Sequence, residues 1–217
     1  MSYSVAIFDL DGTLLDTLED LYLSVNRALS RHHLPTRTRD EVRTFVGDGV
    51  EMLVRRAVPA TVGEEEILSV LADFKTIYAD TCDRHTAPYA GICSLLRALR
   101  EGGVRVAVVS NKFDAAVKRL CQNYFGELID VAVGEHRGIP KKPSPEIVFE
   151  ALRALGAAVG DAVYIGDSDV DIQTAKNAGM DCISVTWGFR DEAFLVEHGA
   201  GCLARSTTEL QKWILNP

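Results

Sequence analysis

Three short segments, far apart in the sequence, carry the polar side chains best suited to chemistry. Each one directly follows an apolar run that is typical of a buried parallel strand. Ligands of an open parallel sheet bind outside the carboxyl ends of its strands, so the three segments are predicted to meet in one crevice. The side chains expected there are those of Asp9, Asp11, Ser110, Asp167 and Asp171.

Four carboxylates in one crevice would repel one another. Like charges in close proximity raise each other's pKa and destabilise the fold unless another charge compensates them. The set offers oxygen donors and no Cys or His, which favours Mg²⁺ over zinc. An EF-hand loop starting at Asp167 is excluded, because it would need Gly and Glu where the chain has Ile172 and Ala178.

Five apolar runs predict the strands that position these residues. Helical patterns separate most of them, and strands that alternate with helices indicate βαβ units, hence an α/β fold with a parallel sheet covered on both faces. The expected strands are 4–8, 105–109, 131–133, 162–165 and 182–185. The expected helices among them are 91–101, 145–155 (with Ser144 as N-cap) and 169–178.

The stretch 16–84 breaks this alternation. Its apolar residues fall at helical spacing, and Thr38 with Glu41 and Thr61 with Glu64 match the capping-box pattern of two helix starts. About 70 consecutive helical residues are far more than a crossover between parallel strands needs. We therefore expect an inserted all-α subdomain at 16–84 and a core made of 1–15 and 85–217.

Composition and charge narrow the range of partners. The 217 residues, 47% of them hydrophobic, suit a core with a smaller insertion. The formal net charge of -8 disfavours nucleic acid and anionic membranes. The five cysteines form no CxxC pair and the N-terminus lacks the pattern of a signal peptide. We expect a cytoplasmic protein with reduced thiols, either a monomer or a homodimer.

Four motifs along the chain resemble those of the haloacid dehalogenase superfamily. They occur in the order that the superfamily has, each at a predicted strand end or loop. In chain order they are Asp9-Leu10-Asp11-Gly12-Thr13-Leu14-x-Asp16, Ser110-Asn111, Lys142-Pro143-x-Pro145, and Gly166-Asp167 with Asp171. The resemblance spans 4–188 and implies a Rossmann-like parallel core with a helical cap. Segments 16–21 and 45–53 are most similar to the phosphoglycolate phosphatase branch.

This resemblance implies Mg²⁺-dependent hydrolysis of a small phosphorylated metabolite through an aspartyl phosphate. Asp9 would be the nucleophile, and Asp11 would protonate the leaving group and then activate water. The metal would be held by Asp9, Asp167 and the main-chain carbonyl of Asp11, with Asp171 as an outer ligand or an orienting carboxylate. The substrate would be bound by residues of the first three motifs, namely Thr13, Ser110, Asn111 and Lys142.

Two glycines of the expected cap are candidates for reading the substrate. Gly47 and Gly49 precede an apparent helix start, where backbone N–H groups could receive a substrate carboxylate. Arg43, Arg55 and Arg56 are candidate supporting cations. The alternative interpretation of the glycines is a plain loop between two helices.

Two other functions stay open. A phosphosugar phosphatase or a β-phosphoglucomutase-like phosphotransferase would share the first motif, but mutases of this group carry a His where this chain has Leu21. A non-catalytic module that binds a phosphorylated ligand would not need the acid/base pair that Asp9 and Asp11 provide. Dehalogenases and phosphonate hydrolases lack the second aspartate, so Asp11 disfavours both.

Overall fold

A six-stranded parallel sheet forms the centre of the protein. The computed structural model describes residues 3–216. The strand order is β5-β4-β1-β6-β7-β8, and each neighbouring pair is parallel. The strands are β1 (Val5–Phe8), β4 (Arg105–Phe113), β5 (Val131–Glu135), β6 (Ala162–Gly166), β7 (Asp181–Val185) and β8 (Leu203–Ala204).

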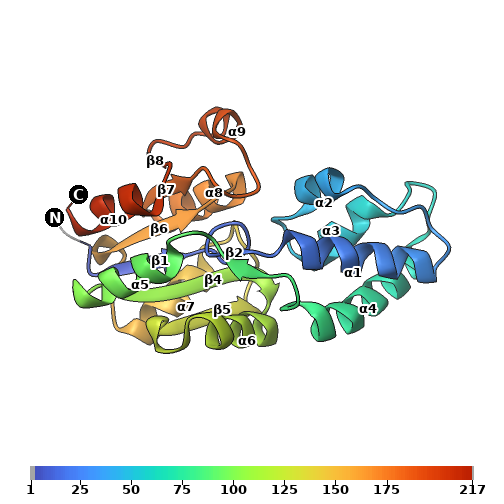
Figure 1. Ribbon diagram of the computed structural model, residues 1–217, viewed down its shortest axis with the longest axis horizontal. Coiled ribbons are helices and arrows are strands. Elements are labelled where there is room, and N and C mark those ends of the chain that lie inside the picture. Colours follow the sequence, from blue (N-terminus) through green and yellow to red (C-terminus); the bar gives the residue numbers. More distant parts are fainter. Residues whose placement is uncertain (1–2, 217) are drawn as a thin grey trace.

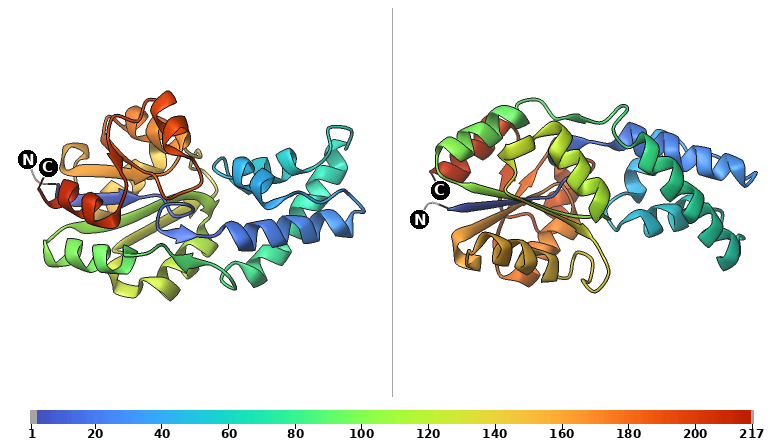
Figure 2. Two further views of the ribbon diagram at one scale, coloured as in Figure 1. Left: turned by 45° about the horizontal axis from the view of Figure 1, so that its top comes forward. Right: turned by 90° about the horizontal axis from the view of Figure 1, so that it is seen from below.

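Helices cover both faces of this sheet (Figure 2). Successive side chains of a strand point to opposite faces, so in β1 the Val5 and Ile7 side chains join one apolar cluster and the Ala6 and Phe8 side chains the other. The first cluster is closed by α7 (Glu146–Leu155) and α8 (Asp169–Ala178). The second is closed by α5 (Ile92–Glu101), α6 (Asp114–Tyr124) and α10 (Thr207–Leu215). The short α9 (Glu192–Glu197) follows β7.

Four helices between β1 and α5 gather at one end of the molecule, and we call them the helical group (Figure 1). They are α1 (Leu18–Arg31), α2 (Arg39–Phe45), α3 (Val50–Ala57) and α4 (Glu64–Thr81). The two connections to the sheet pair with each other as an antiparallel ribbon, β2 (Leu15–Asp16) with β3 (Ala87–Pro88). The buried Asp20 carboxylate fastens the second connection, because it accepts hydrogen bonds from the backbone N–H groups of His85 and Thr86.

The predicted fold class is confirmed: the structure is an α/β fold with a Rossmann-like parallel sheet. All five predicted strands are present, and β4 continues to Phe113. The two-residue strands β2, β3 and β8 were not predicted, because such short segments have no measurable periodicity. The boundaries proposed for the core and the inserted subdomain stay a prediction. No helix in residues 3–216 has both the length and the apolar character that crossing a membrane requires.

Two predicted helix starts are wrong. Ser144 does not cap α7, because Pro145 is the N-cap residue and the Ser144 hydroxyl donates to the Glu146 carboxylate instead. Thr61 does not cap α4, whose N-cap is Gly63. The predicted capping box of Thr38 and Glu41 is confirmed at the start of α2.

The two threonines provide a matched test of capping. Thr38→Ala removes the side chain that accepts from the Glu41 N–H, so it should lower the free energy of unfolding by about 1 kcal/mol. Thr61→Ala removes no cap and should change it by less than about 0.5 kcal/mol. Urea denaturation followed by circular dichroism measures both. Equal losses for the two variants would contradict the assignment.

Candidate active site

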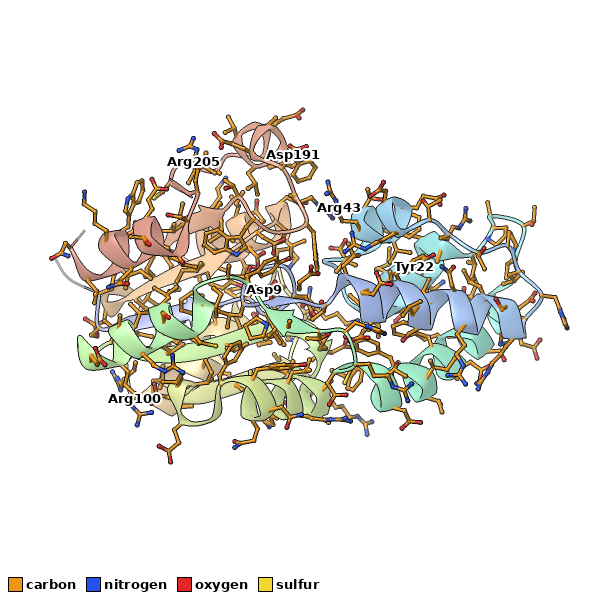
Figure 3. All side chains as sticks on the ribbon, viewed as in Figure 1. Asp9, Tyr22, Arg43, Arg100, Asp191 and Arg205 are labelled. Atoms are coloured by element: carbon orange, nitrogen blue, oxygen red, sulfur yellow. The ribbon has the colours of Figure 1, made fainter. Side chains whose placement is uncertain are left out.

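The predicted site residues lie at the end of the sheet that faces the helical group, where Figure 3 shows Asp9. Asp9 directly follows β1, and Asp167 directly follows β6, the neighbouring strand. Asp171 lies in the first turn of α8. Asp9, Asp167 and Asp171, which we call the carboxylate cluster, are buried and have oxygens within 4.8 Å of one another.

Lys142 is the cation of this cluster. Its ammonium lies 2.8 Å from Asp9 Oδ1 and 2.8 Å from Asp171 Oδ1, and its side chain is 2% exposed. Asn111 holds the Lys142 backbone from both sides: Asn111 Oδ1 accepts from the Lys142 N–H at 2.8 Å, and Asn111 Nδ2 donates to the Lys142 carbonyl at 3.0 Å. Asn111 of the second motif therefore positions Lys142 of the third motif.

Negative charge exceeds positive charge in the carboxylate cluster. Burial raises the pKa of Asp9 to about 7, against the opposing effect of the Lys142 ammonium. Burial and the neighbouring carboxylates also raise the pKa of Asp167 well above its ordinary value. A divalent cation would supply the missing positive charge, and donors that are all oxygens are those that Mg²⁺ prefers. The residues present therefore fit a metal site.

Asp171 differs from the other two carboxylates in how its oxygens are used. Oδ1 accepts from Lys142 and from the Tyr164 hydroxyl, and Oδ2 accepts from the Ser168 hydroxyl and from the backbone N–H groups of Asp167 and Ser168. These donors occupy its lone pairs. Asp171 is thus arranged to orient Lys142, and Asp9 and Asp167 keep the capacity to bind a metal.

Asp167 is oriented by two donors on its far side. Its Oδ1 accepts from the Thr13 hydroxyl at 3.1 Å, and its Oδ2 accepts from the Phe189 N–H at 2.7 Å. Thr13 is fully buried behind Asp167, so its side chain serves this carboxylate. Gly12 makes the close packing possible: its φ is +88°, and a Cβ there would lie 2.3 Å from Asp167 Oδ2.

A second buried lysine, Lys112, holds the Asp11 carboxylate. Its ammonium lies 2.8 Å from Asp11 Oδ1, which also accepts from the Thr17 hydroxyl at 2.6 Å. On its other side the Lys112 ammonium lies 4.7 Å from the centre of the Tyr78 ring in α4. The sequence interpretation missed Lys112. Its position directly after Ser110-Asn111 could have indicated that Lys112 lies at the site. The predicted strand ended at residue 109, whereas β4 continues through Lys112.

A small cavity lies between the carboxylate cluster and the helical group. The centres of water-sized molecules can occupy about 40 Å³ within it. Its lining includes most of the predicted site residues, namely Asp9, Asp11, Gly47, Gly49, Ser110, Asn111, Lys142 and Asp167. The side chains that the helical group contributes are apolar, namely Leu21, Val46, Val50 and Leu53. The wall is completed by residues that were not predicted for the site, namely Lys112, Ser168, Phe189 and Arg190.

The arginines predicted to support the cap glycines are placed elsewhere. Arg55 binds Glu51 and Glu64, and Arg56 binds Asp48. Neither they nor Arg43 line the cavity. Gly49 instead lies against the sheet: its φ is +85°, and a Cβ there would come within 3.1 Å of the Asn111 carbonyl oxygen.

The chain matches the model of a known family over residues 6–185, and that family is described as haloacid dehalogenase-like hydrolase. The match covers most of the chain. The protein therefore belongs to the haloacid dehalogenase-like hydrolases, as its four motifs predicted.

Several proteins similar to this chain are phosphoglycolate phosphatases. A phosphoglycolate phosphatase of Pseudomonas putida is 33% identical over 191 residues, which cover 85% of this chain and 70% of that protein. One of Aquifex aeolicus is 34% identical and covers 85% of each chain. The crystal structure of a protein proposed to be a phosphoglycolate phosphatase, from Lactobacillus delbrueckii subsp. bulgaricus, matches with a TM-score of 0.94, 38% identity and full coverage of both chains. The predicted class, a phosphatase most like phosphoglycolate phosphatase, is confirmed.

Removing the cation from the buried Asp11 pair should cost stability. Lys112→Met leaves the carboxylate without its charged partner and should lower the free energy of unfolding by about 3 to 5 kcal/mol. The control is Lys118→Met, which breaks the exposed pair with Asp114 and should cost less than about 0.5 kcal/mol. Urea titrations of both variants give the comparison, and a Lys112 variant as stable as the wild type would refute a structural role for this pair.

Proposed function

We propose that the protein hydrolyses a small phosphate monoester with the help of Mg²⁺, by transferring the phosphoryl group first to Asp9 and then to water. The observation that carries this proposal is the position of the Asp9 carboxylate. It lies on the wall of the cavity, within 2.8 Å of the Lys142 ammonium and inside the carboxylate cluster. A carboxylate held beside an ammonium can attack phosphorus and divide one slow step into two.

Asp9, Asp167 and the main-chain carbonyl of Asp11 would hold the metal in this proposal. Mg²⁺ would neutralise charge on the nucleophile and on the phosphate, which is worth several kcal/mol in the transition state. Asp171 stays outside this ligand set, because donors from the chain already occupy its oxygens. Its function is to hold Lys142 against Asp9.

Three groups of the chain would bind the phosphoryl oxygens. The Lys142 ammonium already contacts Asp9, so a phosphoryl group on Asp9 lies within its reach. Ser110 Oγ accepts from the Lys112 N–H at 3.2 Å, which leaves its hydroxyl hydrogen available for a phosphoryl oxygen. The Asn111 N–H is the third donor that we propose, since its side chain is occupied by Lys142 and by the Gly47 carbonyl.

Asp11 would carry the proton. It donates to the oxygen of the leaving alcohol when Asp9 attacks, and in the second step it takes a proton from the water that cleaves the aspartyl phosphate. Thr17 and Lys112 bind the same oxygen, Oδ1, and so fix the orientation of this carboxyl group. This leaves Oδ2 for the exchange of the proton.

The cavity supports a small substrate. The names of the relatives indicate a short ester, phosphoglycolate, and the cavity wall that the helical group contributes is narrow enough to favour it over a phosphosugar. In this proposal Gly47 and Gly49 face the end of the substrate opposite its phosphate, and their backbone N–H groups would receive its carboxylate. A cytoplasmic location and a monomeric or homodimeric state stay predictions.

Asp9→Asn tests the nucleophile. The amide has the same shape but is a poor nucleophile, so turnover of p-nitrophenyl phosphate should fall at least about a thousandfold while the circular dichroism spectrum stays unchanged. As a control, EDTA should abolish wild-type activity and excess Mg²⁺ should restore it. Normal activity of a folded, Mg²⁺-supplied Asp9→Asn sample would sink the proposal.

Asp11→Asn tests the proton transfer. An alkyl phosphate needs its leaving oxygen protonated, whereas p-nitrophenolate leaves readily without a proton. The variant should therefore lose kcat/KM on phosphoglycolate at least about tenfold more than on p-nitrophenyl phosphate. Initial rates on both esters measure this ratio, and equal losses would remove the acid role from Asp11.

A further inference from the structure

The C-terminal end of α2 lacks a cap of its own. The last carbonyl groups of a helix have no partner inside the helix, and a left-handed glycine commonly turns the chain so that they are satisfied. Here the C-cap residue Val46 is extended with φ -73° and ψ 149°, and the following Gly47 has φ +131°, far from the left-handed helical value of about +57°. The carbonyl groups at this end of α2 therefore need donors from elsewhere.

Arg190, which follows β7 in the sheet part of the protein, supplies most of these donors. Its Nη1 donates to the Arg43 carbonyl at 2.9 Å, and its Nη2 donates to the carbonyls of Thr44 at 3.2 Å and Val46 at 2.8 Å. Figure 3 shows Arg43 at the end of α2 that faces the sheet. A planar guanidinium is suited to binding several carbonyl groups, and a cation is favourable at a helix C-terminus.

The carbonyl of Phe45 is bound differently. Its partner is Arg56 Nη1, at 2.9 Å, and Arg56 belongs to α3 of the same helical group. Arg190 and Arg56 thus cap the same helix end, Arg190 from the sheet part and Arg56 from the helical group. Of these two arginines, only Arg190 joins the helical group to the sheet part.

The position of Arg190 is fixed relative to the carboxylate cluster. The preceding residue, Phe189, donates its N–H to Asp167 Oδ2 at 2.7 Å. The Arg190 guanidinium also lies over the Phe194 ring, 5.5 Å from its centre. A further bond, from Asn111 Nδ2 to the Gly47 carbonyl at 3.1 Å, holds the adjoining segment of the helical group. Residues 46 and 47 are therefore bound to the same part of the protein that carries Asp9.

We propose that Arg190 is a positioning residue that keeps the helical group closed over the cavity by completing the C-terminal end of α2. The expected change in kcat/KM rests on the proposed function. The expected change in the closure of the helical group rests on the contacts of Arg190 alone. Opening the helical group would return the carbonyls of Arg43, Thr44 and Val46 to water. Closing it would exclude water from the cavity that Arg190 itself lines.

The kinetic test compares two esters. Phosphoglycolate carries a short two-carbon acid, whereas p-nitrophenyl phosphate carries an aromatic ring, so the second ester needs more room between the sheet part and the helical group. Arg190→Gln should lower kcat/KM about tenfold or more for phosphoglycolate and change it less than about twofold for p-nitrophenyl phosphate. Arg190→Lys, which keeps the charge but not the fork of donors, should give an intermediate loss.

The matched control is Arg56→Gln. It removes a donor from the same end of α2 without touching the sheet part, so kcat/KM for both esters should stay within about twofold of the wild type. Equal losses of Arg190→Gln on both esters, or no loss on either, would overturn the inference. An effect of Arg56→Gln as large as that of Arg190→Gln would overturn it too.

Small-angle X-ray scattering supplies a readout that does not depend on the reaction. With Mg²⁺ and vanadate present, Arg190→Gln should have a larger radius of gyration than the wild type, and Arg56→Gln should match the wild type. Equal radii of the wild type and Arg190→Gln would overturn the closing role. This result is expected if Arg190 only binds substrate, because such a role would change the kinetics and leave the radius unchanged. A wild type that hydrolyses neither ester would refute the proposed function, while the scattering comparison would still decide the inference.

Discussion

The burial of three carboxylates around one ammonium is the constraint on which the rest of the site depends. Asp9, Asp167 and Asp171 would repel one another if Lys142 did not lie between two of them. The protein satisfies this constraint with several donors: Asn111 fixes the Lys142 backbone, and the start of α8 fixes Asp171. Because such a cluster remains short of positive charge, the pKa values of Asp9 and Asp167 are raised, and a bound cation would stabilise their ionised form.

Each of the two aspartates of the first motif forms an ion pair with a different buried lysine. Lys142 faces Asp9 and belongs to the carboxylate cluster, whereas Lys112 faces Asp11 and packs against Tyr78 of α4. Asp11 therefore has a partner that is itself shared with the helical group. The two aspartates thus have different surroundings, because their cations come from different segments of the chain, and the nucleophile and acid/base roles proposed for them would need such a difference.

The sequence allowed the strands, the parallel sheet and the meeting of distant carboxylates to be predicted, because burial periodicity and strand-end position are local signals. It did not reveal Lys112, since a lysine after a strand is ordinarily solvated and its burial depends on Tyr78 from another helix. It did not reveal Arg190 either, because its acceptors are backbone carbonyls that any sequence possesses. Thr61 is an opposite case, in which the sequence pattern was present without the structure: Thr61 and Glu64 match a capping box, but the helix begins after Gly63.

The ribbon of β2 and β3 has a consequence for how this protein family can diversify. Leu15 pairs with Pro88 and Asp16 with Ala87, so the chain leaves the sheet and returns to it at adjacent points. Whatever lies between those points can lengthen, shorten or be exchanged without altering the strand order or the registers of the sheet. A change in the helical group therefore need not move the strand ends that carry Asp9 and Asp167.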